Sequence, residues 1–486
     1  MENMRNKVGL IVFACLFSFF SMGQIKFFKI FADNGYDFGQ GIVELADSSY
    51  MITGSSSSFL DAPSQAFMLK IDKNGNHLWA KHFGASEADL GRRILSWDDS
   101  VFFIAGYSNS FGAGDFDFHL WKVNKNGELI SEKSYGGTGW EKLNDALITQ
   151  DSSIIMVGQT SSTTNSNGNF YIVKTDHNGD TLWTRNFGSI GEDVLNSVKQ
   201  LNDTTFYAVG SKYNADSSLV KAVVMRFYSD GVIDWEEEYG DYGAYELFDF
   251  YFLYSNIYAA GGRVHPIDGD KDEYILRMAN TGVPESEGII HAEGDKVVKG
   301  VALYGSAGMA YVAAEFKDQF SAGYSTDVIY NRYYESLFWD NNFVVVPFPL
   351  EETHGELIKT LDGGAIATGS IASGDFGGSA IYVIKIGPND NYPVVNLSNT
   401  GSLVFLDENE TVANLSIYPN PTTAQFTVSI SEKATILVQD GFGRQIIKSV
   451  MNQTKEFDVS TWDAGIYFVT IELENGTKLT RKLIVQ

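Results

Sequence analysis

The chain has 486 residues, a formal net charge of -26 at pH 7 and a single cysteine, Cys15. An acidic surface of that size repels phosphate backbones, so nucleic acid is excluded as an expected partner. With no cysteine after residue 15, the rest of the chain has no disulfides, thiolate nucleophiles or Cys-ligated zinc. Aromatic residues make up 14% of the sequence, with Phe and Tyr dominant, which favours strands over helices.

The N-terminus has the layout of a secretory signal peptide. Arg5 and Lys7 precede the apolar run VGLIVFACLFSFF, and small or polar residues follow in SMGQ. We therefore predict a signal peptide over residues 1–23. A lipoprotein box ending at Cys15 is the weaker alternative, because the residues after it are apolar and not a polar tether. No later segment offers about 18 continuous apolar residues, so we expect no transmembrane segment in the mature chain and a secreted or outer-membrane cell-surface location.

The region after the signal repeats with a pitch of 52 residues. One recurring anchor is a turn glycine, found at Gly75, Gly127, Gly179, Gly231 and Gly282. A second anchor is the small residue that ends an apolar strand, found at Gly54, Gly106, Gly158, Gly210, Gly262, Ala314 and Gly369. The two anchors keep the same phase, so the sequence contains seven related units, of which the last two have drifted.

Each unit consists of short strands joined by tight turns. Segments such as FMLKI and FYIVK precede the turn, and runs such as LWAKHFG and LWTRNFG follow it. In the tetrads that begin at Asp72 and Asp176, the Asp is placed to accept backbone hydrogen bonds and the Gly to take the positive φ of a bulged hairpin. Four strands in about 52 residues are typical of a propeller blade, so we predict an all-β chain with a seven-bladed β-propeller.

The first strand is predicted to complete the last unit. Residues 26–37 match the strand that follows the turn in the next unit, whereas no such strand follows IYVIKI in the seventh unit. Residues 25–32 would then pair with this final blade and remove an open sheet edge. The predicted propeller spans residues 25–388 and is closed by the N-terminal strand.

The C-terminal part has a different character. Residues 389–412 are expected to be a linker, and residues 413–486 contain short alternating strands (FTVSI, ATILVQD, IYFVTIEL, KLTRKLIV) with Asp-Gly and Asn-Gly turns. About 70 residues of this kind predict a small Ig-like antiparallel β-sandwich.

This segment resembles the type A C-terminal sorting domain of the bacterial type IX secretion system. The resemblance is carried by the terminal KLIV and by Tyr418, Pro419, Asn420, Pro421, Gly465 and Tyr467. Trp462 stands where the family usually has an aliphatic residue. The resemblance implies export by the type IX secretion machinery and usually removal of the domain by a sortase-like peptidase. It covers about 70 residues and implies no activity for the repeats.

Four carboxylates recur at the repeat pitch: Asp37, Asp89, Glu141 and Asp193. They are expected at one height on neighbouring blades. One interpretation is that each caps the loop that enters a strand; the other is an acidic arc on the rim that binds cations or sugar hydroxyls.

A second acidic stretch contains Asp268, Asp270 and Asp272, which alternate as in calcium loops. The Glu at the twelfth position of an EF-hand is missing, so a solvated turn is the simpler alternative. Calcium is the one cofactor that the sequence leaves open, and no other is expected.

No catalytic motif stands out. HExxH, GxSxG and complete GxGxxG patterns are absent. The turn before Trp79, Trp183 and Trp235 is similar to the tryptophan-docking motif of quinoprotein dehydrogenases, but its Asp-to-Gly spacing is one residue shorter, and we interpret these tryptophans as wedges between blades. We therefore expect no enzyme, but an exported non-catalytic propeller that binds a glycan or protein ligand. The alternatives are a polysaccharide-degrading or quinoprotein-like enzyme and a passive surface-layer component.

Overall fold

The computed structural model divides the chain into two compact units, Met1–Phe405 and Leu406–Gln486. It describes residues 27–32, 35–58, 62–163, 167–214, 219–241, 243–265, 269–290, 295–304, 309–317, 326–333, 339–345, 351–373, 378–387, 400–402, 416–418, 422–440, 444–462, 465–473 and 478–485. The predicted signal peptide and most of the predicted linker lie outside these ranges. The described residues form strands and turns and no helix, so the all-β prediction is confirmed. None of them therefore belongs to a helix that could span a membrane.

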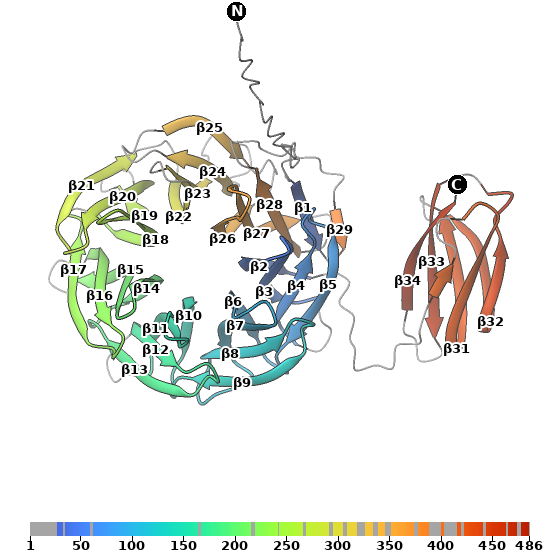
Figure 1. Ribbon diagram of the computed structural model, residues 1–486, viewed down its shortest axis with the longest axis horizontal. Helices are drawn as coiled ribbons and strands as arrows, with labels where there is room; N and C mark the ends of the chain where they lie inside the picture. The colour runs from blue at the N-terminus through green and yellow to red at the C-terminus, as the bar shows by residue number, and fades with distance from the viewer. Residues whose placement is uncertain are drawn as a thin grey trace, which may run out of the picture. The chain divides into compact units, whose positions relative to one another are not determined.

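Unit 1 is a ring of mainly antiparallel sheets, which have four strands each except for the five-stranded last sheet (Figure 1). The first sheets in chain order are β2 (Asp37–Glu44) to β5 (His77–Phe83), with β3 (Tyr50–Ser56) and β4 (Gln65–Ile71) between them; β6 (Asp89–Ser96), β7 (Val101–Ser108), β8 (Asp117–Asn124) and β9 (Leu129–Tyr135); and β10 (Glu141–Ile148), β11 (Ile154–Thr160), β12 (Asn169–Thr175) and β13 (Thr181–Phe187).

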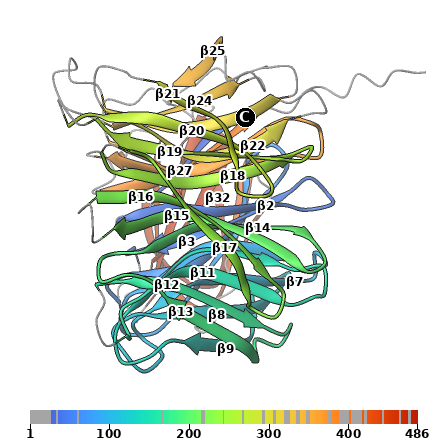
Figure 2. The same ribbon diagram turned by 90° about the vertical axis from the view of Figure 1, so that its left-hand side faces the viewer.

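The next sheets are β14 (Val194–Asn202), β15 (Thr205–Asn214), β16 (Leu219–Tyr228) and β17 (Ile233–Tyr239); β18 (Tyr245–Leu253), β19 (Asn256–Val264), β20 (Lys271–Ala279) and β21 (Pro284–Ile290); and β22 (Asp295–Tyr304), β23 (Met309–Lys317), β24 (Thr326–Tyr333) and β25 (Trp339–Val345). Neighbouring sheets pack face to face, as the side view shows for β14–β17 and β18–β21 (Figure 2). Buried aliphatic and aromatic side chains between the sheets form the core.

The last sheet of the ring joins both ends of unit 1. It contains β26 (Glu352–Lys359), β27 (Ala365–Ser373) and β28 (Gly378–Ile386), followed by β1 (Phe27–Ala32) and β29 (Thr400–Ser402). β1 pairs antiparallel with β28, with Phe27 opposite Lys385, and parallel with β29. β1 thus lies beside β28, where the phase of the repeat predicts that the N-terminal strand completes the last unit. Because the two strands are more than 340 residues apart, their pairing holds the ring together.

Turn glycines position each sheet against the previous one. Gly231 has a φ of 82°, and a Cβ added there would lie 3.0 Å from the ring of Trp183 on the preceding sheet. The indole Nε1 of Trp183 also donates a 3.0 Å hydrogen bond to the carbonyl oxygen of Ser229 in the same turn. Trp79 lies in the same way against Gly127. These tryptophans therefore pack between sheets.

Unit 2 consists of β30 (Ser416–Tyr418), β31 (Gln425–Asp440), β32 (Gln445–Asp458), β33 (Gly465–Leu473) and β34 (Lys478–Val485). The long β31 pairs with β30, β32 and β33, so the described strands form one connected sheet. Its buried core includes Phe426, Ile436 and Val469. The Ig-like sandwich stays a prediction, because separate sheets are not found among these strands.

Candidate functional site

The innermost strand of every sheet in unit 1 carries a β-bulge at the same place. The pairing register shifts between Gly39 and Gly41 in β2 and at the equivalent position of each other inner strand. A bulge bends a strand and changes the direction of the next side chain. The residues that follow the bulges are Gly41, Arg93, Asp145, Ser197, Asp249, Gly300 and Glu356.

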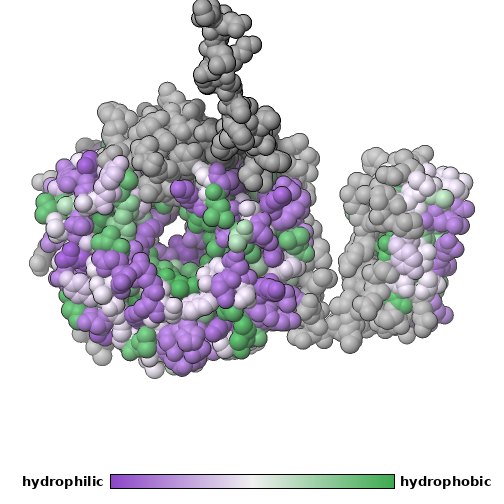
Figure 3. Space-filling model, viewed as in Figure 1, coloured by the Kyte–Doolittle hydropathy of each residue, from purple (hydrophilic) through white to green (hydrophobic). Residues whose placement is uncertain are grey.

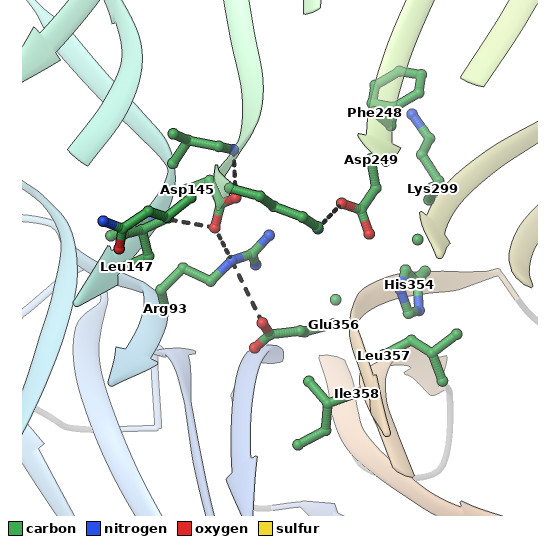
Figure 4. A pocket seen from close by; sticks show the side chains of 16 residues that line it. Arg93, Asp145, Leu147, Phe248, Asp249, Lys299, His354, Glu356, Leu357 and Ile358 are labelled. Atoms are coloured by element: carbon green, nitrogen blue, oxygen red, sulfur yellow. Dashed lines mark hydrogen bonds and ion pairs between the residues drawn. The ribbon is translucent and has the colours of Figure 1, made fainter. Parts of the chain in front are cut away.

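Charged side chains at these positions meet across the channel (Figure 4). The Arg93 Nε lies 2.7 Å from Asp145 Oδ1 and 3.7 Å from Glu356 Oε1, so one guanidinium joins carboxylates from two other sheets. Ser197 Oγ lies 3.0 Å from carboxylate oxygens of both Asp145 and Asp249. Lys199 Nζ donates to Asp249 Oδ1 at 2.5 Å. Side-chain hydrogen bonds and ion pairs therefore link several sheets of the ring across the channel.

Backbone N–H groups complete this network. Each carboxylate accepts a hydrogen bond from the second residue after the bulge on the next sheet: Asp145 from Val198 at 2.9 Å, Asp249 from Val301 at 2.9 Å and Glu356 from Ile42 at 2.7 Å. The last of these bonds joins the last and first sheets of the ring. A carboxylate at the position after the bulge thus accepts the same backbone hydrogen bond from the next sheet in all three cases.

Electrostatics differ among the charged groups of the channel. Burial alone would lower the pKa of Arg93, but the charges of Asp145 and Glu356 outweigh burial and hold that pKa above its usual value. Burial raises the pKa of Glu356, and the positive charge of Arg93 offsets only part of that rise.

The series of side chains is interrupted at Gly41 and at Gly300, and other polar groups gather at the gap at Gly300. A Cβ added to Gly300 would lie 2.5 Å from Nε2 of His354, which therefore occupies space that a side chain would fill. His354 is only 9% exposed, and its Nε2 has no hydrogen-bond partner among the described residues. Lys299 lies beside the gap, with its Nζ 3.5 Å from the centre of the Phe248 ring.

His354 is uncharged at neutral pH. Burial, together with the positive charges of Arg93 and Lys299, lowers its pKa to about 3. Its Nδ1 lies 3.4 Å from the hydroxyl of Tyr330, which in turn lies 2.8 Å from the hydroxyl of Tyr382. These buried groups hold the imidazole in place, with its Nε2 against Gly300 and without a hydrogen-bond partner among the described residues.

A cavity of about 280 Å³ lies at this part of the channel. It is lined by the charged side chains that follow the bulges, by Lys199, Lys299 and His354, and by apolar side chains that include Phe248, Leu357 and Ile358 (Figure 4). The space-filling view shows an opening at the centre of the ring (Figure 3). Polar groups of both charges and apolar surface therefore face one cavity in the channel.

The four carboxylates that recur at the pitch lie elsewhere and are fully buried. Asp37, Asp89 and Glu141 each accept a hydrogen bond from a Ser or Thr hydroxyl nineteen residues further on. Asp89 also accepts from the Ala85 N–H at 2.8 Å, and Asp193 accepts from the Tyr213 N–H at 3.0 Å. These bonds fasten the loops before the inner strands; a role on a ligand-binding rim stays a prediction.

The predicted calcium loop is only partly described. Asp268 lies outside the described residues, and Asp270 is half-buried. Asp272 is buried and accepts a 2.6 Å hydrogen bond from Arg263 within an ion pair. No cluster of three potential metal ligands occurs among the residues with defined placement. Calcium binding stays a prediction.

The sorting motif is likewise only partly described. Tyr418 is 54% exposed and Gly465 is also exposed, whereas Tyr467 is buried with its ring centroid 4.8 Å from that of Trp462. Pro419, Asn420 and Pro421 lie outside the described residues.

The sequence comparison identifies unit 2. Residues 416–486 match the family described as secretion system C-terminal sorting domain. This segment is a type IX secretion sorting domain. The resemblance predicted from its motifs is therefore confirmed. The sorting domain implies interaction with the type IX secretion machinery and export to the cell surface or medium. A search of curated proteins finds no match for the chain.

Comparison with solved structures gives propeller neighbours for the other unit. The β-propeller domain of the Trilobed protease from Pyrococcus furiosus is 10% identical, with 74% of this chain and 98% of that chain covered and a TM-score of 0.42. The likeness at this identity concerns the fold alone.

The prediction that the chain is not an enzyme, which rested on the absence of catalytic motifs, is wrong. Similar solved structures include a thermostable family-43 glycoside hydrolase, 13% identical over 52% of this chain and 95% of that chain, with a TM-score of 0.32. Another is a subtype N10 neuraminidase-like protein of a little yellow-shouldered bat influenza A virus, 12% identical over 77% and 99% of the two chains, with a TM-score of 0.37. Enzymes thus occur among the structural neighbours, although these likenesses give this chain no activity.

Proposed function

We propose that unit 1 is a seven-bladed propeller that binds a carbohydrate in its central channel after export by the type IX pathway. The observation that carries this proposal is the gap at Gly300, where the buried Nε2 of His354 has no partner beside a cavity of about 280 Å³. A buried polar atom without a partner is costly, and a ligand group that satisfies it gains binding free energy.

The chemistry of the cavity suits sugar hydroxyls. A hydroxyl donates one hydrogen bond and accepts others, and the cavity offers carboxylates as acceptors and Lys199 and Lys299 as donors. The apolar side chains of Phe248 and Leu357 offer surface for the C–H face of a sugar ring. The volume is near the lower end for ligand sites, which favours one sugar residue in the channel.

The test is a glycan array probed with the purified full chain, followed by calorimetric titration of the best ligand. Gly300→Ala places a methyl group against His354 Nε2 and should weaken binding at least tenfold. Gly465→Ala is the matched control, because a Cβ there meets nothing within 4 Å. Silence across the array, or equal affinity for both variants, would contradict the proposal.

Hydrolysis of the bound carbohydrate is the second candidate function, and one observation favours it. Glu356, whose pKa is raised by burial, shares the channel with Asp145, which accepts bonds from Arg93, Ser197 and a backbone N–H. Two carboxyl groups in unlike environments are the arrangement that acid–base cleavage of a glycosidic bond requires. Release of reducing ends by the full chain, lost in Glu356→Gln, would establish it; an equal rate in both would refute it.

We also propose that the mature protein is released or held at the cell surface by means of the sorting domain. Deletion of residues 413–486 should leave the chain inside a bacterium that has the type IX machinery, whereas the full chain should reach the surface or medium. Fractionation with antibody detection distinguishes the two. Export of the truncated chain at the normal level would contradict this role.

A further inference from the structure

A second cavity, of about 400 Å³, lies between the first two sheets of unit 1, at the end where β2 and β6 begin. It differs from the channel site in residues and in chemistry. Three aromatic side chains line it, Tyr36, Phe38 and Tyr107, together with Gln40 and Arg92. Serine residues of β3 and of the loop between β3 and β4 complete the wall.

Arg92 is the charged group of this cavity, and no described carboxylate lies within ion-pair distance of it. Its one hydrogen bond to a side chain runs from Nη1 to Oε1 of Gln40 at 2.5 Å. Its Nε is buried and has no hydrogen-bond partner among the described residues. The neighbouring Arg93, by contrast, lies within 4 Å of two carboxylates. Of these two adjacent arginines on β6, only Arg93 is therefore paired with described carboxylates.

An unpaired guanidinium in a partly buried site favours an anionic ligand. Burial lowers the pKa of Arg92 from its usual value, which shows that desolvation of its charge is not fully offset by neighbours. The planar guanidinium offers donors in a fork that matches a carboxylate. A carboxylate that enters the cavity could therefore accept a charge-assisted hydrogen bond from this side chain.

The aromatic residues favour a ring over a small inorganic anion. Tyr36 is 59% exposed, a large aromatic surface open to solvent at the cavity. Tyr107 is half-buried, and its ring is fixed edge-on against Phe116 with centroids 5.5 Å apart. Rigid tyrosines supply apolar contact area together with a hydroxyl that can form hydrogen bonds. The cavity volume also exceeds what an acetate-sized group fills.

We propose that this cavity binds an acidic sugar residue, with the carboxylate on Arg92 and the sugar ring against Tyr36 and Tyr107. The inference rests on the proposed function only for the ligand class, carbohydrate, and it uses none of the residues of the channel gap. The cavity between the first two sheets would then be a subsite that selects uronic-acid polysaccharides by their charge.

The experiment compares acidic and neutral oligosaccharides on the full chain. The probes are trimers of galacturonate, mannuronate, guluronate and glucuronate, each with its neutral counterpart that carries a hydroxymethyl group in place of the carboxylate. Calorimetric titration should give at least one acidic trimer a Kd at least tenfold below that of its neutral partner. The preference should shrink when salt is raised from about 0.05 to about 0.5 M.

Two variants and one control locate the site. Arg92→Met should abolish the preference for the acidic trimer, whereas Lys73→Met, which removes one positive charge from an exposed turn, should retain it. Tyr36→Ala should weaken binding at least fivefold without changing the melting temperature, because the side chain is largely exposed. The Tyr36→Ala variant therefore still tests the site if the Arg92→Met variant does not fold.

Two kinds of outcome overturn the proposal. Equal affinity for acidic and neutral trimers, or a preference that survives in both Arg92→Met and Tyr36→Ala, would remove the subsite. Equally tight binding of acetate, phosphate or a short peptide with a free C-terminal carboxylate would make it a general anion site. Gly300→Ala separates the two proposals: loss of neutral-sugar binding with the acidic preference intact would support both sites independently.

Discussion

Replacing Arg93 by methionine tests whether the channel network stabilises the ring. Arg93 lies 2.7 Å from Asp145 and 3.7 Å from Glu356, so the substitution leaves two carboxylates without their shared cation. Methionine keeps most of the side-chain volume, and the loss therefore reports on charge and not on a cavity.

The expected cost follows from burial. Removing one partner of a fully buried ion pair costs about 3–5 kcal/mol. The three side chains are 17%, 10% and 21% exposed, so water can partly solvate the remaining carboxylates. We therefore expect a loss near the lower limit, about 3 kcal/mol of the free energy of unfolding.

Denaturant unfolding followed by tryptophan fluorescence measures this loss. All tryptophans except Trp462 lie in unit 1, so the signal is dominated by the ring. Lys133→Met is the control, because it removes one cation from an ion pair with Asp180 whose side chains are 36% and 68% exposed. That change should cost less than about 1 kcal/mol. If Arg93→Met costs no more than the control, the network contributes nothing net and the reasoning is refuted.

Three further predictions concern the stability of unit 1. Gly231→Ala places a side chain at a φ of 82° and against Trp183, so thermal melting should show a loss of about 2 kcal/mol in the free energy of unfolding. An unchanged melting temperature would contradict the packing of Trp183 between the sheets. Burial lowers the pKa of His119 to about 3, so between pH 6.5 and 3 the unfolded chain binds a proton that the native chain does not, and stability falls as pH is lowered through that window. His119→Gln should reduce this slope by up to about 1.4 kcal/mol per pH unit in denaturant titrations, and equal slopes would refute the assignment. Thr160→Val removes the 2.5 Å hydrogen bond from the hydroxyl to buried Glu141 and should lower the free energy of unfolding by about 2 kcal/mol. An unchanged free energy in denaturant titrations would mean that another donor replaces the hydroxyl.

Much of the fold could be predicted from the period and the turn chemistry. Asp72 accepts 2.8 Å hydrogen bonds from the N–H groups of Asn74 and Asn76, and Gly75 has a φ of 77°, as the tetrad predicts. These features are local, so one repeat of sequence contains the information. The pairing of β1 with β28 could also be expected, because the phase of the repeat shows where a strand is missing.

The channel site could not be predicted in the same way. A search for similar residues at the pitch finds carboxylates such as Asp89. These are buried and accept hydrogen bonds from the loops before the inner strands, so they stabilise the fold. The channel positions after the bulges keep the pitch of 52 residues from Gly41 to Asp249 but change chemistry from sheet to sheet, so they show no repeated residue type. The gap at Gly300 lies in a drifted unit, where alignment by anchors is weakest.

The central claim is that a carbohydrate satisfies the unpaired Nε2 of His354 in the channel. The most direct measurement is a crystal structure of the full chain with the oligosaccharide that binds most tightly. The account predicts a sugar hydroxyl within about 3.2 Å of His354 Nε2, with the ring beside Gly300. An oligosaccharide bound elsewhere on the ring, with no sugar atom in the channel, would contradict it.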